Sequence, residues 1–154
     1  MTVIVWDGKT LAADREAGTR YIKCTLMTKI QRLADGRLLG VAGDAALARE
    51  LAEWVKAGAK PDSFPAECRP GKANTAMVMV ITTAGRVQVY ESGPYPLEFL
   101  NDRHAIGAGT DAALAVLALG HDAETAVRIA SEVCNGVGGG IDILQLAGHV
   151  SAPQ

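Results

Sequence analysis

Thr2, the second residue of the chain, has the type and the position of an N-terminal nucleophile. If Met1 is removed after synthesis, the hydroxyl and the free α-amine lie on the same residue. An α-amine titrates near about pH 7.7–8.0, where a general base is effective. One threonine can then supply both nucleophile and base. Because many chains begin with Met-Thr, this interpretation depends on which residues the fold brings beside Thr2.

Two charged residues could support such a nucleophile. A threonine hydroxyl is a poor nucleophile, and a nearby cation favours the alkoxide and the unprotonated amine. Strand alternation points Lys29 and Ile30 to opposite faces, so that Lys29 can face a cleft while Ile30 packs. A predicted hairpin folds Asp14 back beside Thr2, where its carboxylate can fix the cation. Taken alone, each residue is more simply explained as a turn-capping aspartate or a solvated lysine.

The segment 40–44 offers a place for a negatively charged oxygen. It ends an apolar strand at Gly43 and opens a helix at Asp44. Backbone N–H groups at the start of a helix are unpaired and lie at the positive end of its dipole, which suits an oxyanion. A simple strand-to-helix glycine turn fits this spacing equally well.

Hydrophobic periodicity predicts the elements that would position these residues. Strands are expected over 2–6, 9–13, 37–42, 75–82, 86–91, 105–109 and 141–147, with one or two more segments within 20–33. Helices are expected over 44–58, 110–119 and 122–134. Loops are expected over 15–19, 59–74 and 93–96. The helix 110–119 is apolar nearly all round, so we expect it to be buried with Leu114 in the core; Val133 is expected to face inward.

This element order predicts one antiparallel-rich α+β domain over residues 1–154, with stacked sheets and helices outside. The glycine-rich run 136–140 follows a helix and precedes a strand, which is the wrong order for a phosphate-binding loop. We therefore expect it to be a tight loop that approaches Thr2 closely.

Composition and charge exclude several classes of protein. The net charge is −2 and the basic residues are scattered, so no nucleic-acid partner is expected. No apolar run is long enough to span a bilayer and no secretion signal is visible, which predicts a cytoplasmic protein without membrane contact. The three cysteines share no metal-ligand spacing and the histidines are isolated, so neither a metal nor a cofactor is expected.

The joint arrangement of these motifs resembles a known family. Thr2 after Met1, the strand end 11–14, the segment 29–33 and the segment 40–43 occur in the order and approximate spacing of proteasome β-type subunits, and of HslV-type peptidases in particular. The stretches 105–109 and 132–134 also fall where that family has similar sequences. The resemblance covers essentially the whole chain.

The resemblance implies a four-layer αββα sandwich of the N-terminal-nucleophile (Ntn) hydrolases. It implies that Thr2 is the nucleophile, Lys29 the activating cation, Asp14 its orienting carboxylate and the Gly43 N–H the oxyanion donor. The activity implied is that of a threonine-type endopeptidase, which forms an acyl-enzyme and releases it with water. Its substrates would be peptides or unfolded proteins, and its partners further copies in a homo-oligomeric ring and an ATP-dependent unfoldase of the kind that feeds HslV-type chambers.

Two other functions stay open on the sequence. A catalytically silent assembly subunit would keep the fold and the ring contacts without the reaction; Ala108, the glycine run and a retained Met1 that caps the amine would fit it. An Ntn amidase would use the same nucleophile on small amides, and the sequence does not expose the pocket residues that decide between peptides and small amides.

Overall fold

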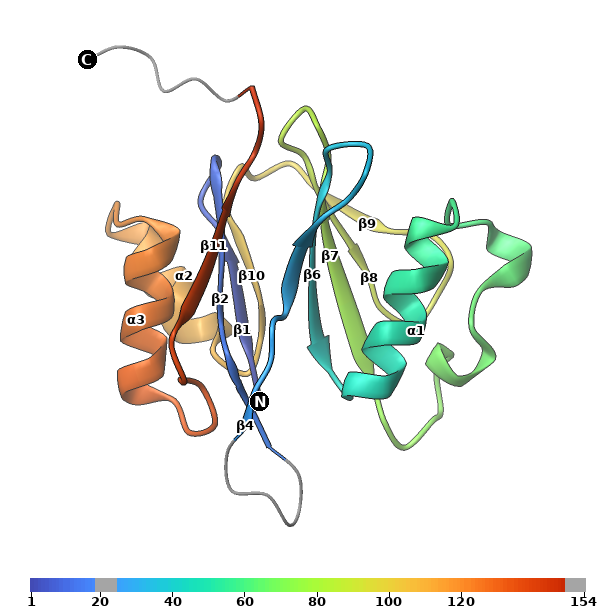
Figure 1. Ribbon diagram of the computed structural model, residues 1–154, viewed down its shortest axis with the longest axis horizontal. Helices are drawn as coiled ribbons and strands as arrows, with labels where there is room; N and C mark the ends of the chain where they lie inside the picture. Colours follow the sequence, from blue (N-terminus) through green and yellow to red (C-terminus); the bar gives the residue numbers. More distant parts are fainter. Residues whose placement is uncertain (19–24, 149–154) are drawn as a thin grey trace.

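The structure is a computed structural model that describes residues 1–18 and 25–148. Two antiparallel sheets face each other across the middle of the molecule (Figure 1). The first has the order β10-β1-β2-β11, with β1 at Val3–Trp6, β2 at Thr10–Asp14, β10 at His104–Gly107 and β11 at Ile141–Gln145. The second has the order β5-β6-β7-β8-β9, with β5 at Ile30–Arg32, β6 at Leu38–Gly43, β7 at Ala76–Ile81, β8 at Val87–Tyr90 and β9 at Leu97–Phe99. A short pair, β3 (Glu16–Ala17) and β4 (Thr25–Leu26), lies beside them.

Strand β1 is buried on both faces, which explains why it is a continuous apolar run. Ile4 and Trp6 point into the core between the two sheets. Val3 and Val5 alternate with them and belong to a separate core beneath the helices. All four side chains are fully buried. The N-terminal segment is therefore held firmly at the centre of the fold.

Helices cover the outer face of each sheet. Helices α2 (Thr110–Ala118) and α3 (Ala123–Val133) pack on the first sheet, and α1 (Ala45–Lys56) packs on the second (Figure 1). Asp44 caps α1, since its carboxylate accepts the backbone N–H groups of Ala46 and Leu47 at 3.0 Å. None of the helices within the described residues has the length and hydropathy needed to cross a membrane.

Two predictions of helix burial are wrong. Leu114 is 36% exposed, because α2 has only one side against the sheet and α3; the buried side chains on it are Ala113, Val116 and Leu117. Val133 is 68% exposed. The buried stripe of α3 passes through Ala130 and continues at Cys134, one turn further on, so that Val133 lies off the stripe.

Predictions of irregular segments also need correction. Strand β3 lies within the predicted loop 15–19, and β9 follows the predicted loop 93–96 as a strand that was not expected. The loop 59–74 contains two 3₁₀ turns, Pro61–Ser63 and Ala66–Cys68. Part of the expected strand region, residues 20–24, lies outside the described residues.

Candidate active site

A buried ion pair lies at the end of the first hairpin. Lys29 Nζ is 2.9 Å from Asp14 Oδ1, and the two side chains are 3% and 0% exposed. Pairing of β1 with β2 sets Ile4 opposite Ala13, which brings Asp14 next to the start of the chain. Lys29 directly precedes β5 in the other sheet, while Ile30 packs in the core. The predicted alternation of Lys29 and Ile30 is therefore confirmed.

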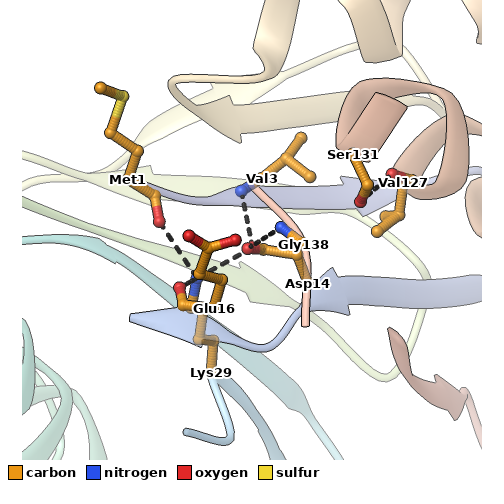
Figure 2. Close-up of polar contacts among 8 residues, drawn as sticks. All are labelled: Met1, Val3, Asp14, Glu16, Lys29, Val127, Ser131 and Gly138. Carbon is orange, nitrogen blue, oxygen red and sulfur yellow. Dashed lines mark hydrogen bonds and ion pairs between the residues drawn. The ribbon is translucent and has the colours of Figure 1, made fainter. Parts of the chain in front are cut away.

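The Asp14 carboxylate accepts hydrogen bonds from three different segments. Its Oδ1 accepts the backbone N–H of Val3 at 3.0 Å as well as the Lys29 ammonium, and its Oδ2 accepts the backbone N–H of Gly138 at 3.1 Å (Figure 2). A buried charge is stable only when it is paired and hydrogen-bonded in this way. The carboxylate is thus fixed in place with its charge satisfied.

The Lys29 ammonium uses all three of its donors. It donates to Asp14 Oδ1 at 2.9 Å, to the carbonyl of Met1 at 3.2 Å and to the carbonyl of Glu16 at 2.5 Å (Figure 2). An ammonium has three N–H groups and no acceptor, so this set is complete. One of the three partners, the Met1 carbonyl, belongs to the peptide bond that joins Met1 to Thr2.

Thr2 is 8% exposed, and close backbone packing holds it there. Its carbonyl accepts the backbone N–H of Gly109 at 3.2 Å. Gly107 has φ +99°, and a Cβ built on it would overlap the Thr2 carbonyl. A glycine is therefore required at position 107 both for its conformation and for this close approach.

Two cavities meet at Thr2. The cavity beside α1, which we call the helix cavity, has a volume of about 620 Å³, and Lys29 contributes to its wall. The cavity beside residues 68–77, which we call the loop cavity, has a volume of about 580 Å³, and Met1 contributes to its wall. Thr2, Ala42 and Gly43 line both. Of the four residues singled out from the sequence, Thr2, Lys29 and Gly43 thus line the helix cavity. The fourth, Asp14, forms the ion pair with Lys29.

Two other nucleophilic side chains, Cys68 and Ser131, are less suited to the chemistry than Thr2. Cys68 lines the loop cavity, but burial raises the pKa of its thiol, and the carboxylates of Glu50 and Glu67 raise it further. A protonated thiol is a weak nucleophile. Ser131 on α3 donates its hydroxyl to the Val127 carbonyl of the same helix at 2.8 Å (Figure 2). Thr2 is therefore the better candidate.

The glycine run 136–140 differs from its prediction. It packs against Asp14 and its neighbours rather than against Thr2: the Gly138 carbonyl accepts the N–H groups of Arg15 and Glu16 at 2.9 and 2.8 Å. Gly136 lies beside the Met1 side chain. The glycine that meets Thr2 is Gly107, which no spacing in the sequence had singled out.

Sequence reasoning also missed the carbonyl of Glu16 as a partner of Lys29, since every residue has such a carbonyl.

Within residues 1–18 and 25–148 no group of three His, Cys, Asp or Glu side chains could hold a metal ion.

Comparison with solved structures defines the class of fold. The chain superposes on HslV from Trypanosoma brucei with a TM-score of 0.67 and 24% identity, covering 94% of this chain and 97% of that one. It superposes on Thiobacillus denitrificans BPH in complex with epoxomicin with a TM-score of 0.69 and 16% identity, covering 96% and 100%. A second structure of BPH gives a TM-score of 0.66 and 18% identity. No family model and no curated protein matches the chain.

These likenesses extend over nearly the whole length of each chain. The fold is accordingly a mixed α/β fold with antiparallel sheets. More particularly, it is the fold of HslV and of BPH. The resemblance to the HslV and proteasome β-type family that was drawn from short sequence motifs is confirmed at the level of the fold.

Proposed function

We propose that this chain is a threonine-type peptidase subunit in which Thr2, once Met1 has been removed, is the nucleophile. The observation that carries this proposal is the buried Lys29–Asp14 ion pair beside Thr2. Burying two charges costs free energy, and a role in activating Thr2 would explain why the fold keeps them. The fold shared with HslV and BPH supports it. We further propose that the two sheets and their outer helices form the four-layer αββα sandwich of Ntn hydrolases.

Removal of Met1 would change the surroundings of Lys29 as well as the chain terminus. Cleavage of the Met1–Thr2 bond turns the Thr2 amide nitrogen into an amine. It also takes away the Met1 carbonyl that accepts one of the three Lys29 N–H groups. That donor then becomes available to the Thr2 hydroxyl, whose alkoxide form it stabilises.

The proposed reaction has two steps. The α-amine accepts the hydroxyl proton as Thr2 Oγ attacks a peptide carbonyl, and the Gly43 N–H donates to the oxygen that becomes negative. The resulting α-ammonium gives its proton to the leaving amine, and an ester remains on Thr2. Water, deprotonated by the same amine, hydrolyses this ester and restores the hydroxyl. Lys29 stays paired with Asp14 throughout.

We also propose that the chain works as a homo-oligomeric ring on peptides or unfolded proteins, with an ATP-dependent unfoldase as a further partner. Exposed apolar side chains support an interface with other chains. Tyr95, Leu97 and Leu100, in and around the edge strand β9, are 74%, 56% and 100% exposed. Native mass spectrometry of the purified protein measures the number of chains; a monomer at all working concentrations would contradict the ring.

A peptide epoxyketone tests the nucleophile and its processing together. This warhead needs a hydroxyl and a free amine on one residue, so we expect an adduct on Thr2 and a chain that lacks Met1. Thr2→Ala should abolish both the adduct and the hydrolysis of fluorogenic peptides while the protein remains folded. Cys68→Ala is the matched control and should keep both. An adduct on Cys68, or full turnover by Thr2→Ala, would refute the assignment.

One observation favours a catalytically silent subunit as the second candidate. With Met1 in place the Lys29 donors are all occupied, and Ala108 adds no hydroxyl next to Gly107. The intact mass of the purified chain separates the two candidates. Loss of one methionine supports the enzyme, and the full-length mass supports the silent subunit.

A further inference from the structure

The two cavities at Thr2 have different positions relative to the scissile bond in the proposed reaction. The α-amine of Thr2 would give its proton to the leaving amine, so the leaving side of the substrate must lie next to that amine. Met1 is attached to the same nitrogen and lines the loop cavity. The leaving side therefore belongs to the loop cavity. The helix cavity is left for the residue whose carbonyl Thr2 attacks.

Four alanines of α1 contribute small side chains to the wall of the helix cavity. Ala48 and Ala52 lie one turn apart on the buried face of α1, and Ala45 and Ala46 lie one turn earlier. None of these side chains extends beyond Cβ. A cavity of about 620 Å³ has room for a side chain such as that of Glu, Gln or Lys, so the charges at its rim can decide among them.

The rim of the helix cavity has an excess of positive charge. Arg49, Glu53 and Lys56 follow one another along the exposed side of α1 and all line the cavity. The Glu53 carboxylate is 2.8 Å from Lys56 Nζ, and the hydrogen bond and charge of Lys56 lower its pKa, as the charge of Arg49 does to a smaller extent. One carboxylate at the rim therefore faces two cations. Lys29 is balanced by Asp14. In the part of the chain that the structure describes, Arg49 has no ion pair.

We infer that the helix cavity binds an acidic side chain on the acyl side of the scissile bond, with Arg49 as its partner. This inference rests on the proposed function and names its substrate class. A guanidinium offers two parallel N–H donors that match a carboxylate, and it keeps its charge at any working pH. A basic side chain in the same cavity would meet a rim of two cations, Arg49 and Lys56, and one anion, Glu53, and this net positive charge would disfavour it.

Three fluorogenic peptides that differ only in the residue before the leaving group test this inference. With Glu, Gln and Lys at that position, we expect kcat/KM to be about fivefold higher for Glu than for its neutral isostere Gln, and lowest for Lys. Arg49→Ala should remove the preference for Glu over Gln, with a larger fall in kcat/KM for the Glu peptide than for the Gln peptide. Arg49→Glu should favour Lys. Arg49 is exposed on a helix, so these variants should fold.

Arg69→Ala is the matched control, since Arg69 lines the loop cavity rather than the helix cavity. It should leave the ratio of Glu to Gln unchanged. An unchanged ratio in Arg49→Ala, or a ratio that falls only in Arg69→Ala, would overturn the inference while the proposed function stands.

The second measurement does not require turnover. Fluorescence anisotropy of labelled peptides ending in Glu amide or Gln amide, on the Thr2→Ala variant, should show tighter binding of Glu that Arg49→Ala removes. Equal affinities would overturn the inference. Failure of the proposed function would appear differently, as an absence of any Thr2 adduct or Thr2-dependent cleavage.

Discussion

Two ion pairs contribute residues to the wall of the helix cavity, and they have nearly the same separation but very different burial. Lys29 and Asp14 are 2.9 Å apart with side chains 3% and 0% exposed, whereas Lys56 and Glu53 are 2.8 Å apart with side chains 33% and 60% exposed. Water and salt screen the second pair, so it adds little to stability. The first pair is costly to bury and costly to break. Burial, rather than distance, distinguishes the pair that we assign to chemistry from the pair at the rim.

Lys29→Met gives the largest expected effect. It leaves the Asp14 carboxylate buried without its cation, and the free energy of unfolding should fall by about 3–5 kcal/mol. Urea denaturation measures this loss, and peptide hydrolysis should disappear with it. Adding Asp14→Asn removes the unpaired charge, so the double variant should be more stable than Lys29→Met while staying inactive. If both variants lose the same stability, the buried charge is not the cause.

Asp122→Ala is expected to have an intermediate effect. Asp122 is exposed, but it caps α3 by accepting the Thr125 N–H at 2.8 Å, and losing a cap costs about 1 kcal/mol. This hydrogen bond lowers the pKa of Asp122 below its ordinary 3.8. The stabilisation is therefore fully present above that ordinary value and is lost as the pH falls through the lower folded pKa. At neutral pH the urea midpoint of Asp122→Ala should lie below that of the wild type, and at acid pH the two midpoints should converge. A difference between them that persists in acid would contradict this.

Glu53→Gln should have the smallest effect. The Lys56 hydrogen bond lowers the pKa of Glu53, but both side chains remain in contact with water. We expect the urea midpoint to match that of the wild type within error at physiological salt. A clear loss of stability would mean that exposed and buried pairs in this fold are not as different as their burial suggests.

The sequence predicted the parts of the site that follow from strand geometry. The predicted hairpin places Asp14 next to Val3. Lys29 directly precedes Ile30, the first residue of β5, so the two side chains point to opposite sides. Backbone partners were out of reach, because the carbonyls of Met1 and Glu16 and the N–H of Gly138 carry no sequence signal. The exposure of Leu114 was also missed, since an apolar helix does not reveal how many of its sides a neighbour covers.

The Gly138 N–H that binds Asp14 lies 124 residues further along the chain. A ribosome makes the hairpin that contains Asp14 first and the glycine run much later. Until that late segment docks, Asp14 Oδ2 lacks the N–H donor that it has in the folded chain. The full set of hydrogen bonds on Asp14 therefore forms only after residue 138 has been synthesised and has docked.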